Sequence, residues 1–252
     1  MFEQALVVVA SFVAGGIDAI VGGGGLILVP ALFVAFPREA PATLLGTNKL
    51  AAIAGTTVSA ARLLPRVAIE WRTLLPAVAL AFAGSLAGAW TLTQIDPGAL
   101  RKALPVVLLA LLVYTLAKKQ FGEQSDPPAS AAVRMAIISA VGVTVGFYDG
   151  LFGPGTGSLM IFLLVRFLRV DFLTASAVSK VLNVATNAAA LLLLSARGAV
   201  WWQVGLWLAV ANIAGGLVGT HLALRFGAGL VKKVFIAVVA LLIVKTGVSA
   251  FS

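Results

Sequence analysis

The chain has 252 residues, of which 61% are hydrophobic and only 11% are charged, and its mean hydropathy is +1.08. These values exclude a soluble globular domain and a disordered chain, since both carry many more polar residues. There is no cysteine and one histidine, His221, which excludes disulfides, thiol catalysis and clustered thiolate or histidine metal sites. We therefore expect an all-α protein that crosses a membrane several times and holds no metal.

The sequence contains an internal repeat at an offset of 131 residues, with no gap. This offset aligns Asp18 with Asp149 and Lys49 with Lys180, and it also aligns glycines, tryptophans and basic residues along the chain. The predicted organisation is a single membrane domain over 1–252, with repeat one at 1–118, a polar connector at 119–132 and repeat two at 133–252.

Each repeat divides into five apolar segments. Glycine-rich strings that break a helix separate the first segment from the second, at Gly22–Gly25 and at Gly153–Gly157. The second segment makes only about 20 Å of helix, which is too short to cross a hydrocarbon layer of roughly 30 Å. We predict in each repeat a broken helical hairpin, re-entrant or barely spanning, followed by three spanning helices. The segments are 4–21, 24–36, 41–61, 73–93, 99–117, 133–148, 155–168, 172–195, 201–222 and 230–250.

The basic residues predict an orientation. If each hairpin returns to its starting side, the repeats are inverted and the 16 loop Lys and Arg divide eleven against five, whereas parallel repeats give seven against nine. Because cytoplasmic loops are rich in Lys and Arg, the uneven split favours inverted repeats with both termini outside. The equivalent Trp71 and Trp202 would then lie at opposite membrane interfaces. The larger group is Arg62, Arg66, Arg72, Lys118, Lys119, Arg134, Arg166, Arg169, Arg225, Lys232 and Lys233; the smaller is Arg38, Arg101, Lys102, Arg197 and Lys245.

Once the Lys and Arg residues assigned to loops are set aside, four ionisable residues remain inside apolar segments. They form two repeat-related pairs, Asp18 with Asp149 and Lys49 with Lys180. A bare charge at membrane depth costs from about 3 to more than 10 kcal/mol, so such residues are candidates for function. The alternative is a snorkelling lysine or an Asp–Lys pair with a structural role only.

Polar residues accompany both lysines at helical spacing. The series is stronger in repeat two, and an alanine, Ala52, replaces an asparagine in repeat one, so we expect two unequal half-sites. The polar residues of repeat two are Ser176, Ser179, Lys180, Asn183 and Asn187; those of repeat one are Asn48, Lys49, Thr56 and Ser59.

A helix that begins at a glycine inside the membrane presents unpaired N–H groups and a partial positive charge, which attract anions. We predict an anion-binding site with Asp18 and Asp149 as coupling or gating groups that carry a proton or coordinate sodium. The alternative is that the glycines only allow close packing, as we expect for the pairs Gly84/Gly88 and Gly215/Gly219. The predicted anion-binding residues are Lys49, Lys180, the amides of Gly24, Gly25 and Gly155, and the side chains of Thr47, Asn48, Ser179, Asn183 and Asn187.

Three strings identify a family resemblance: GIDAIVGGGGLILVP at 16–30, GTNKL at 46–50 and GFYDGLFGPGTG at 146–157. With these strings, nearly the whole chain resembles the TauE/SafE, or sulfite exporter, family of membrane transporters, in a subgroup with the GTNK variant. The resemblance implies secondary transport, mostly export, of a small anion by a protein of the bacterial inner membrane. Sulfite, sulfonates and other sulfur-containing or carboxylate anions are the implied substrates.

The expected function is thus a secondary anion transporter that works by alternating access, and not an enzyme. An anion channel with the same fold is the first alternative. An intramembrane aspartyl protease is the second, suggested by Tyr148-Asp149 and Pro30-Ala31-Leu32 but opposed by the missing G-x-G-D element and the reversed motif order. We expect no cofactor beyond a coupling H+ or Na+. The expected partners are the anion and the lipid bilayer, not nucleic acid, and a homodimer is left open.

Overall fold

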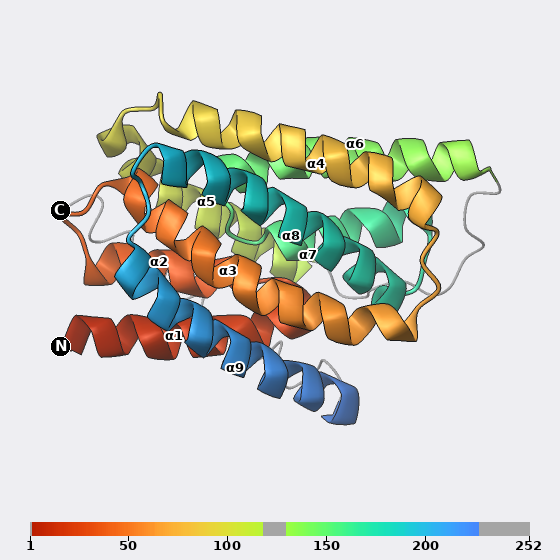
Figure 1. Ribbon diagram of the computed structural model, residues 1–252, viewed down its shortest axis with the longest axis horizontal. Coiled ribbons are helices and arrows are strands. Elements are labelled where there is room, and N and C mark those ends of the chain that lie inside the picture. The colour runs from red at the N-terminus through yellow and green to blue at the C-terminus, as the bar shows by residue number, and fades with distance from the viewer. Residues whose placement is uncertain (1, 118–129, 227–252) are drawn as a thin grey trace.

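The computed structural model of the protein describes residues 2–117 and 130–226, and all regular structure in these ranges is helical. The fold is an elongated bundle with the helices roughly along its long axis (Figure 1). The all-α prediction is confirmed, whereas most of the connector and the segment 230–250 lie outside the described residues. The helices are α1 (Phe2–Val21), α2 (Gly25–Ala35), α3 (Pro41–Leu63), η1 (Leu64–Arg66), α4 (Trp71–Leu92), α5 (Pro97–Ala117), α6 (Ala131–Leu151), α7 (Thr156–Leu163), η2 (Leu164–Leu168), α8 (Phe172–Ala196) and α9 (Trp202–Phe226).

Four described helices are long and apolar enough to cross a bilayer: α4, α6, α8 and the part of α9 over Trp202–Leu222. Three of them were predicted as spans. The fourth, α6, was predicted only as the short arm 133–148 of a hairpin, but it has 21 residues because it begins at Ala131 and continues through Gly150 to Leu151. Helix α3 has 23 residues but is not among the four, since its lysine, asparagine and threonines lower its hydropathy.

The predicted helix breaks are present in both repeats. Helix α1 ends at Val21 and α2 begins at Gly25, while α6 ends at Leu151 and α7 begins at Thr156. Three glycines in these breaks have positive φ, at +73° for Gly22, +90° for Gly153 and +76° for Gly155, a conformation that side chains other than glycine strongly disfavour. The chain can therefore reverse within a few residues.

The first hairpin returns to the end of the bundle where it starts. Phe36, directly after α2, packs edge-on against Trp201 with ring centroids 5.1 Å apart. Gln4, near the start of α1, lines a cavity beside the same tryptophan. Helix α2 has 11 residues, which corresponds to about 16 Å, roughly half of a bilayer core. Helices α1 and α2 thus form a hairpin that starts and ends at the same end of the bundle.

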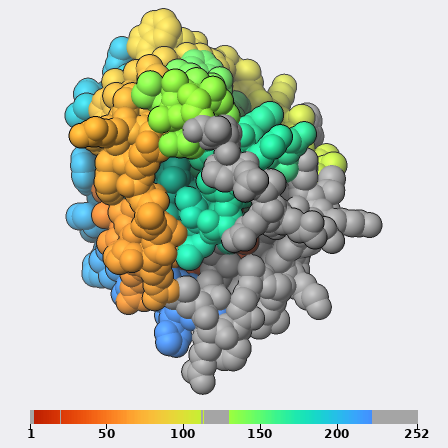
Figure 2. Space-filling view, turned by 90° about the vertical axis from the view of Figure 1, so that its right-hand side faces the viewer, coloured from red at the N-terminus to blue at the C-terminus, as the bar shows by residue number. Residues whose placement is uncertain are grey.

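The second hairpin also starts and ends at one end of the bundle, opposite to that of the first hairpin. Arg134, near the start of α6, forms an ion pair with Glu70 at 2.8 Å, and Leu168, at the end of η2, lines a cavity with both residues. Figure 2 views this end, with the orange end of α3 and the connection to α4 beside the green start of α6. The two hairpins enter the bundle from opposite ends.

The first helix of each repeat packs against the other repeat. Helix α1 of repeat one packs on α9 of repeat two, and α6 of repeat two packs on α4 of repeat one. The predicted packing glycines make these contacts: a Cβ on Gly88 would lie 2.0 Å from the carbonyl oxygen of Phe147, and one on Gly215 would lie 1.8 Å from that of Phe12. Because α1 corresponds to α6 and α4 to α9, the first helix of each repeat packs on the fourth helix of the other repeat.

The contacts also fix the directions of the helices. Gly84 faces Val143 and Gly88 faces Phe147, so α4 and α6 run parallel to each other. Helices α1 and α9 likewise run parallel, from left to right in Figure 1, whereas α4 and α6 run from right to left. The repeat-equivalent helices α1 and α6 therefore run in opposite directions through the bundle.

Basic residues gather unequally at the two ends of the bundle. At the end where α3 stops and α4 begins, α6 also begins and η2 ends, and this end carries Arg62, Arg66, Arg72, Arg134, Arg166 and Arg169. The opposite end carries Arg38, Arg101, Lys102 and Arg197. Trp71 and Trp202, both about half exposed, begin α4 and α9 at opposite ends, as predicted.

The inner arm of the first hairpin lies in the protein core. Nine of the 11 residues of α2 are buried, and its leucines belong to one apolar cluster that also includes Leu104 and Leu108 of α5. Since apolar side chains surround α2, packing helps to hold the hairpin tip at Gly22–Gly25 at mid-bundle. A second apolar cluster joins α4, α6, α7 and α8.

Candidate functional site

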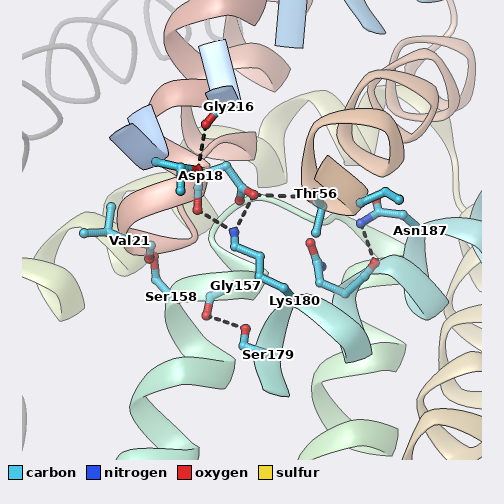
Figure 3. Close-up of polar contacts among 12 residues, drawn as sticks. Asp18, Val21, Thr56, Gly157, Ser158, Ser179, Lys180, Asn187 and Gly216 are labelled. Carbon is cyan, nitrogen blue, oxygen red and sulfur yellow. Dashed lines mark hydrogen bonds and ion pairs between the residues drawn. The ribbon is translucent and has the colours of Figure 1, made fainter. Parts of the chain in front are cut away.

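The tips of the two hairpins touch each other at the centre of the bundle. The backbone N–H of Ser158 donates to the carbonyl of Gly22 at 3.0 Å, and its hydroxyl donates to the carbonyl of Val21 at 2.6 Å (Figure 3). A Cβ on Gly22 would lie 2.5 Å from the carbonyl carbon of Gly157, so the contact requires glycine at both positions.

Each lysine forms an ion pair with the aspartate of the other repeat. Lys49 Nζ lies 2.9 Å from Asp149 Oδ1, and Lys180 Nζ lies 2.5 Å from Asp18 Oδ2. The side chains of Lys49 and Asp149 are both 2% exposed, that of Lys180 is 1% exposed and that of Asp18 is 15% exposed. Figure 3 shows the Lys180–Asp18 pair below the end of α1. The four charged residues singled out by the internal repeat therefore form two ion pairs, and each pair joins one repeat to the other.

The lysines also bind the ends of the broken helices. Lys49 donates to the carbonyl of Asp149 at 2.5 Å, and Lys180 donates to the carbonyl of Asp18. These carbonyls belong to the last turns of α6 and α1, where the helix dipole places partial negative charge that a cation stabilises. A Cβ on Gly153 would lie 2.8 Å from Lys49 Nζ, so the glycine gives the lysine access.

A threonine hydroxyl completes each pair, but the two threonines are not repeat equivalents. Thr56 of α3 donates to Asp18 Oδ2 at 3.2 Å, and Thr156 of α7 donates to Asp149 Oδ1 at 2.8 Å. The residue equivalent to Thr56 is Asn187, which donates to the carbonyl of Asn183 instead. Among the described residues, Asp149 Oδ2 is buried without a hydrogen-bond partner. The hydrogen bonds of the two pairs therefore differ in detail.

A cavity of about 20 Å³ lies between the two pairs, and a volume of this size holds about one water molecule. It brings together residues that the sequence predicted for the site. They are Gly25, Asn48, Lys49, Gly155, Asn183 and Asn187, with both aspartates, Asp18 and Asp149.

Gly25 and Gly155 line this cavity, and no backbone hydrogen bond from either N–H group is present among the described residues. Such N–H donors at the starts of α2 and α7 can bind an anion. Lys180 lies beside the cavity through its pair with Asp18. The geometry therefore places two cations and two free amide donors around one small space.

Besides Lys180, three residues predicted for the site are not part of the cavity lining. Thr47 accepts from the N–H of Trp201 at 3.0 Å, and Ser179 donates to the carbonyl of Gly157 at 3.2 Å. Gly24 packs against Ala14 and the Cβ of Asp18. Sequence reasoning missed Thr156, inside the glycine string, and Ser158, directly after it, because their short hydroxyl side chains carry no charge or periodicity.

The described residues contain no group of acidic and histidine side chains that could hold a metal ion. Spanning helices with two interrupted hairpins that meet at a buried, charged centre define a multi-pass membrane transporter. The chain belongs to the family described as Sulfite exporter TauE/SafE, which matches residues 7–246. The resemblance seen in the sequence is thereby confirmed, and the protein is a membrane transporter rather than an enzyme.

Relatives with similar sequences carry the same general description. The chain is 33% identical to a "Probable membrane transporter protein" of Haemophilus influenzae, over 92% of this chain and 89% of the relative. It is 35% identical to "Probable membrane transporter protein ORF9" of Sinorhizobium sp, over 93% and 88%. It is 32% identical to "Probable membrane transporter protein YfcA" of Escherichia coli K12, over 93% and 86%. No solved structure matches the chain.

Proposed function

We propose that the protein is a secondary transporter that moves a small anion across the bacterial inner membrane by alternating access. The observation that carries this proposal is the pair of buried lysines, each held at the tip of a re-entrant hairpin by the aspartate of the other repeat. A buried cation paired by an exchangeable carboxylate is a site that an anionic substrate can enter by replacing that carboxylate.

The opposite directions of α1 and α6 support inverted repeats, the arrangement in which alternating access works by rocking one set of helices against the other. The unequal basic ends support an orientation with Arg62, Arg66 and Arg134 at the cytoplasmic face and both termini outside. Each re-entrant hairpin then opens toward one face of the membrane.

The present conformation is closed to a substrate. A cavity of about 20 Å³ is too small for a sulfite or sulfonate anion, which has several heavy atoms. Because the hairpin tips meet at Gly22 and Gly157, separating them is the motion that enlarges the cavity. In the proposed cycle one hairpin at a time moves away, and the anion meets a lysine and the free amides of Gly25 and Gly155.

The substrate class follows from the family to which the chain belongs and from the donors present. Two ammonium groups, backbone amides and the side chains of Asn183 and Asn187 suit the oxygens of a sulfite, a sulfonate or a small carboxylate. We propose export as the direction of net transport.

Counterflow in proteoliposomes tests the proposal. The purified protein is reconstituted with sulfite, thiosulfate, methanesulfonate, sulfate or acetate inside, and uptake of the same labelled anion is measured. We expect uptake of at least one of these anions by the wild type and its loss in Lys49→Ala and Lys180→Ala. The control is Lys102→Ala, an exposed lysine at one end of the bundle. Equal uptake in both lysine variants and the control would refute the site.

A channel with the same fold is distinguished by energetics. A secondary transporter accumulates the labelled anion against its gradient when a proton or sodium gradient is imposed, whereas a channel only equilibrates it. Uptake that stops at equilibrium under both gradients would favour the channel.

A further inference from the structure

The charged centre of the bundle is neutral as a whole. It holds two lysines and two aspartates, and each of the four belongs to an ion pair. An anion that binds Lys49 in place of Asp149 leaves that carboxylate, with 2% of its side chain exposed, without a counter-charge. A buried unpaired carboxylate is strongly unfavourable. Binding of an anion at Lys49 therefore needs one compensating positive charge.

We infer that this charge is a proton that binds Asp149, so that each transported anion charge moves with one proton. This inference rests on the proposed anion transport. The two oxygens of Asp149 differ: Oδ1 accepts from Lys49 at 2.9 Å and from Thr156 at 2.8 Å, whereas Oδ2 is buried and has no partner among the described residues. A proton from the aqueous side that forms an O–H bond at Oδ2 breaks no hydrogen bond and leaves Lys49 charged for the anion.

Asp18 differs from Asp149 in its burial. Its Oδ2 accepts from both Lys180 and Thr56, as Asp149 Oδ1 accepts from Lys49 and Thr156, but its side chain is 15% exposed, against 2% for Asp149. At the position equivalent to Thr56, Asn187 directs its amide to Asn183 rather than to Asp149. The hydroxyl donor to Asp149 therefore comes from Thr156 of α7, and its other oxygen, unlike either oxygen of Asp18, is buried without a partner among the described residues.

The surroundings of Asp149 favour a proton over sodium. Lys49 lies against it from α3, and Asp18, with its partner Lys180, borders the same cavity from α1 and α8. Tyr148 donates its hydroxyl to the carbonyl of Pro154, and α4 presents Ser85, which donates to Thr186. A metal cation would lie next to the ammonium of Lys49 in a cavity of about 20 Å³, where Coulomb repulsion opposes it.

Proton uptake on anion binding tests the inference directly. Methanesulfonate, the anion of a strong acid that carries no proton itself, is added to the purified protein in weakly buffered detergent with a pH indicator. We expect the wild type to take up about one proton per bound anion, because the charges must balance. Asp149→Asn is expected to take up none, whereas the surface control Glu70→Gln keeps the wild-type ratio.

Flux in proteoliposomes separates this inference from the proposed function. We expect Asp149→Asn to retain labelled methanesulfonate counterflow, which also reports its fold, and to lose accumulation driven by a proton gradient. Unchanged proton-driven accumulation in Asp149→Asn, or accumulation driven by sodium alone in the wild type, would overturn the inference while leaving anion transport intact. If Asp149→Asn does not fold, the wild-type ratio decides, and a ratio of zero overturns the inference. A wild type that binds and exchanges no anion of the panel would overturn the proposed function itself.

Discussion

Lys49 forms its ion pair with Asp149, 100 residues further along the chain and in the other repeat. Its repeat equivalent, Lys180, likewise pairs with the aspartate of the other repeat, Asp18. Each pair therefore joins a continuous helix, α3 or α8, to the last turn of a broken helix from the opposite repeat. A conformational change in one repeat therefore alters an ion pair that joins it to the other repeat.

The Lys49–Asp149 pair predicts a double-mutant result. Lys49→Met leaves a buried carboxylate unpaired, and breaking a buried pair in this way costs about 3–5 kcal/mol. The double variant Lys49→Met with Asp149→Leu removes both charges, so we expect it to regain most of that stability while transport stays lost. The measurement is thermal unfolding in detergent beside methanesulfonate counterflow. A double variant less stable than Lys49→Met would contradict a direct pair.

The contact between the hairpin tips predicts coupled effects at Gly22 and Gly157. A Cβ at either position meets the backbone of the other at 2.5 or 2.6 Å, and Gly22 also has φ +73°. We expect Gly22→Ala and Gly157→Ala each to lower stability by about 1–3 kcal/mol and to slow counterflow.

Because both variants disturb the same contact, the cost of the double variant should be smaller than the sum of the single costs. The matched control is Gly98→Ala, whose Cβ would meet only the side chain of Asp96. Strict additivity of the two tip variants would show that the tips act independently.

The start of α8 predicts a dependence of stability on pH. Asp171 caps this helix by accepting from the N–H groups of Leu173 and Thr174 at 2.9 and 3.0 Å. Burial raises the pKa of its carboxyl, but the hydrogen bonds from Thr174 and Leu173 outweigh this, so the pKa is lowered. A carboxyl with a lowered folded pKa stabilises the fold above its ordinary pKa of about 4 and loses this effect as the pH falls through the folded pKa.

We therefore expect Asp171→Ala to lower stability by about 1 kcal/mol at neutral pH, and the difference from the wild type to shrink in acid. Asp171→Asn, which can still cap the helix, should lose less. Unfolding temperatures measured over a pH series check this. A difference that grows as the pH falls would contradict the assigned sign.

The unequal basic ends of the bundle predict which face is cytoplasmic. The protein has no native cysteine, so single cysteines report accessibility without background. Ala40→Cys, before α3, and Ala68→Cys, before α4, are exposed positions at opposite ends. We expect an impermeant maleimide to label Ala40→Cys in intact cells and Ala68→Cys only after permeabilisation. The reverse pattern would overturn the proposed orientation.

Much of the fold could be predicted from the sequence because the features that limit where helices span and break can be read along the chain. The length of an apolar run limits whether it spans, and a string such as Gly22–Gly25 breaks a helix wherever it lies. The 131-residue offset by itself singles out the four buried charges. The length of α6 was underestimated, since Gly150 is tolerated inside a helix that packs it against Ser85.

The pairing of charges could not be predicted, since each lysine has two aspartates of identical chemistry within the same fold. The choice depends on the exchange of α1 and α6 between repeats, which rests on glycine contacts spread over four helices. The role of Thr156 and the free oxygen of Asp149 depend on distances of a few tenths of an ångström. Such details are set by packing rather than by residue type.

The exchange of first helices between repeats also affects how the chain is made. When repeat one has left the ribosome, Lys49 has no partner until α6 is synthesised about 100 residues later, and the glycine face of α1 waits still longer for α9. The nascent first half must therefore sit in the translocon or the lipid with an unpaired charge and an uncovered groove. Synthesising the two halves as separate polypeptides should yield neither alone in stable form, while their co-expression should restore both.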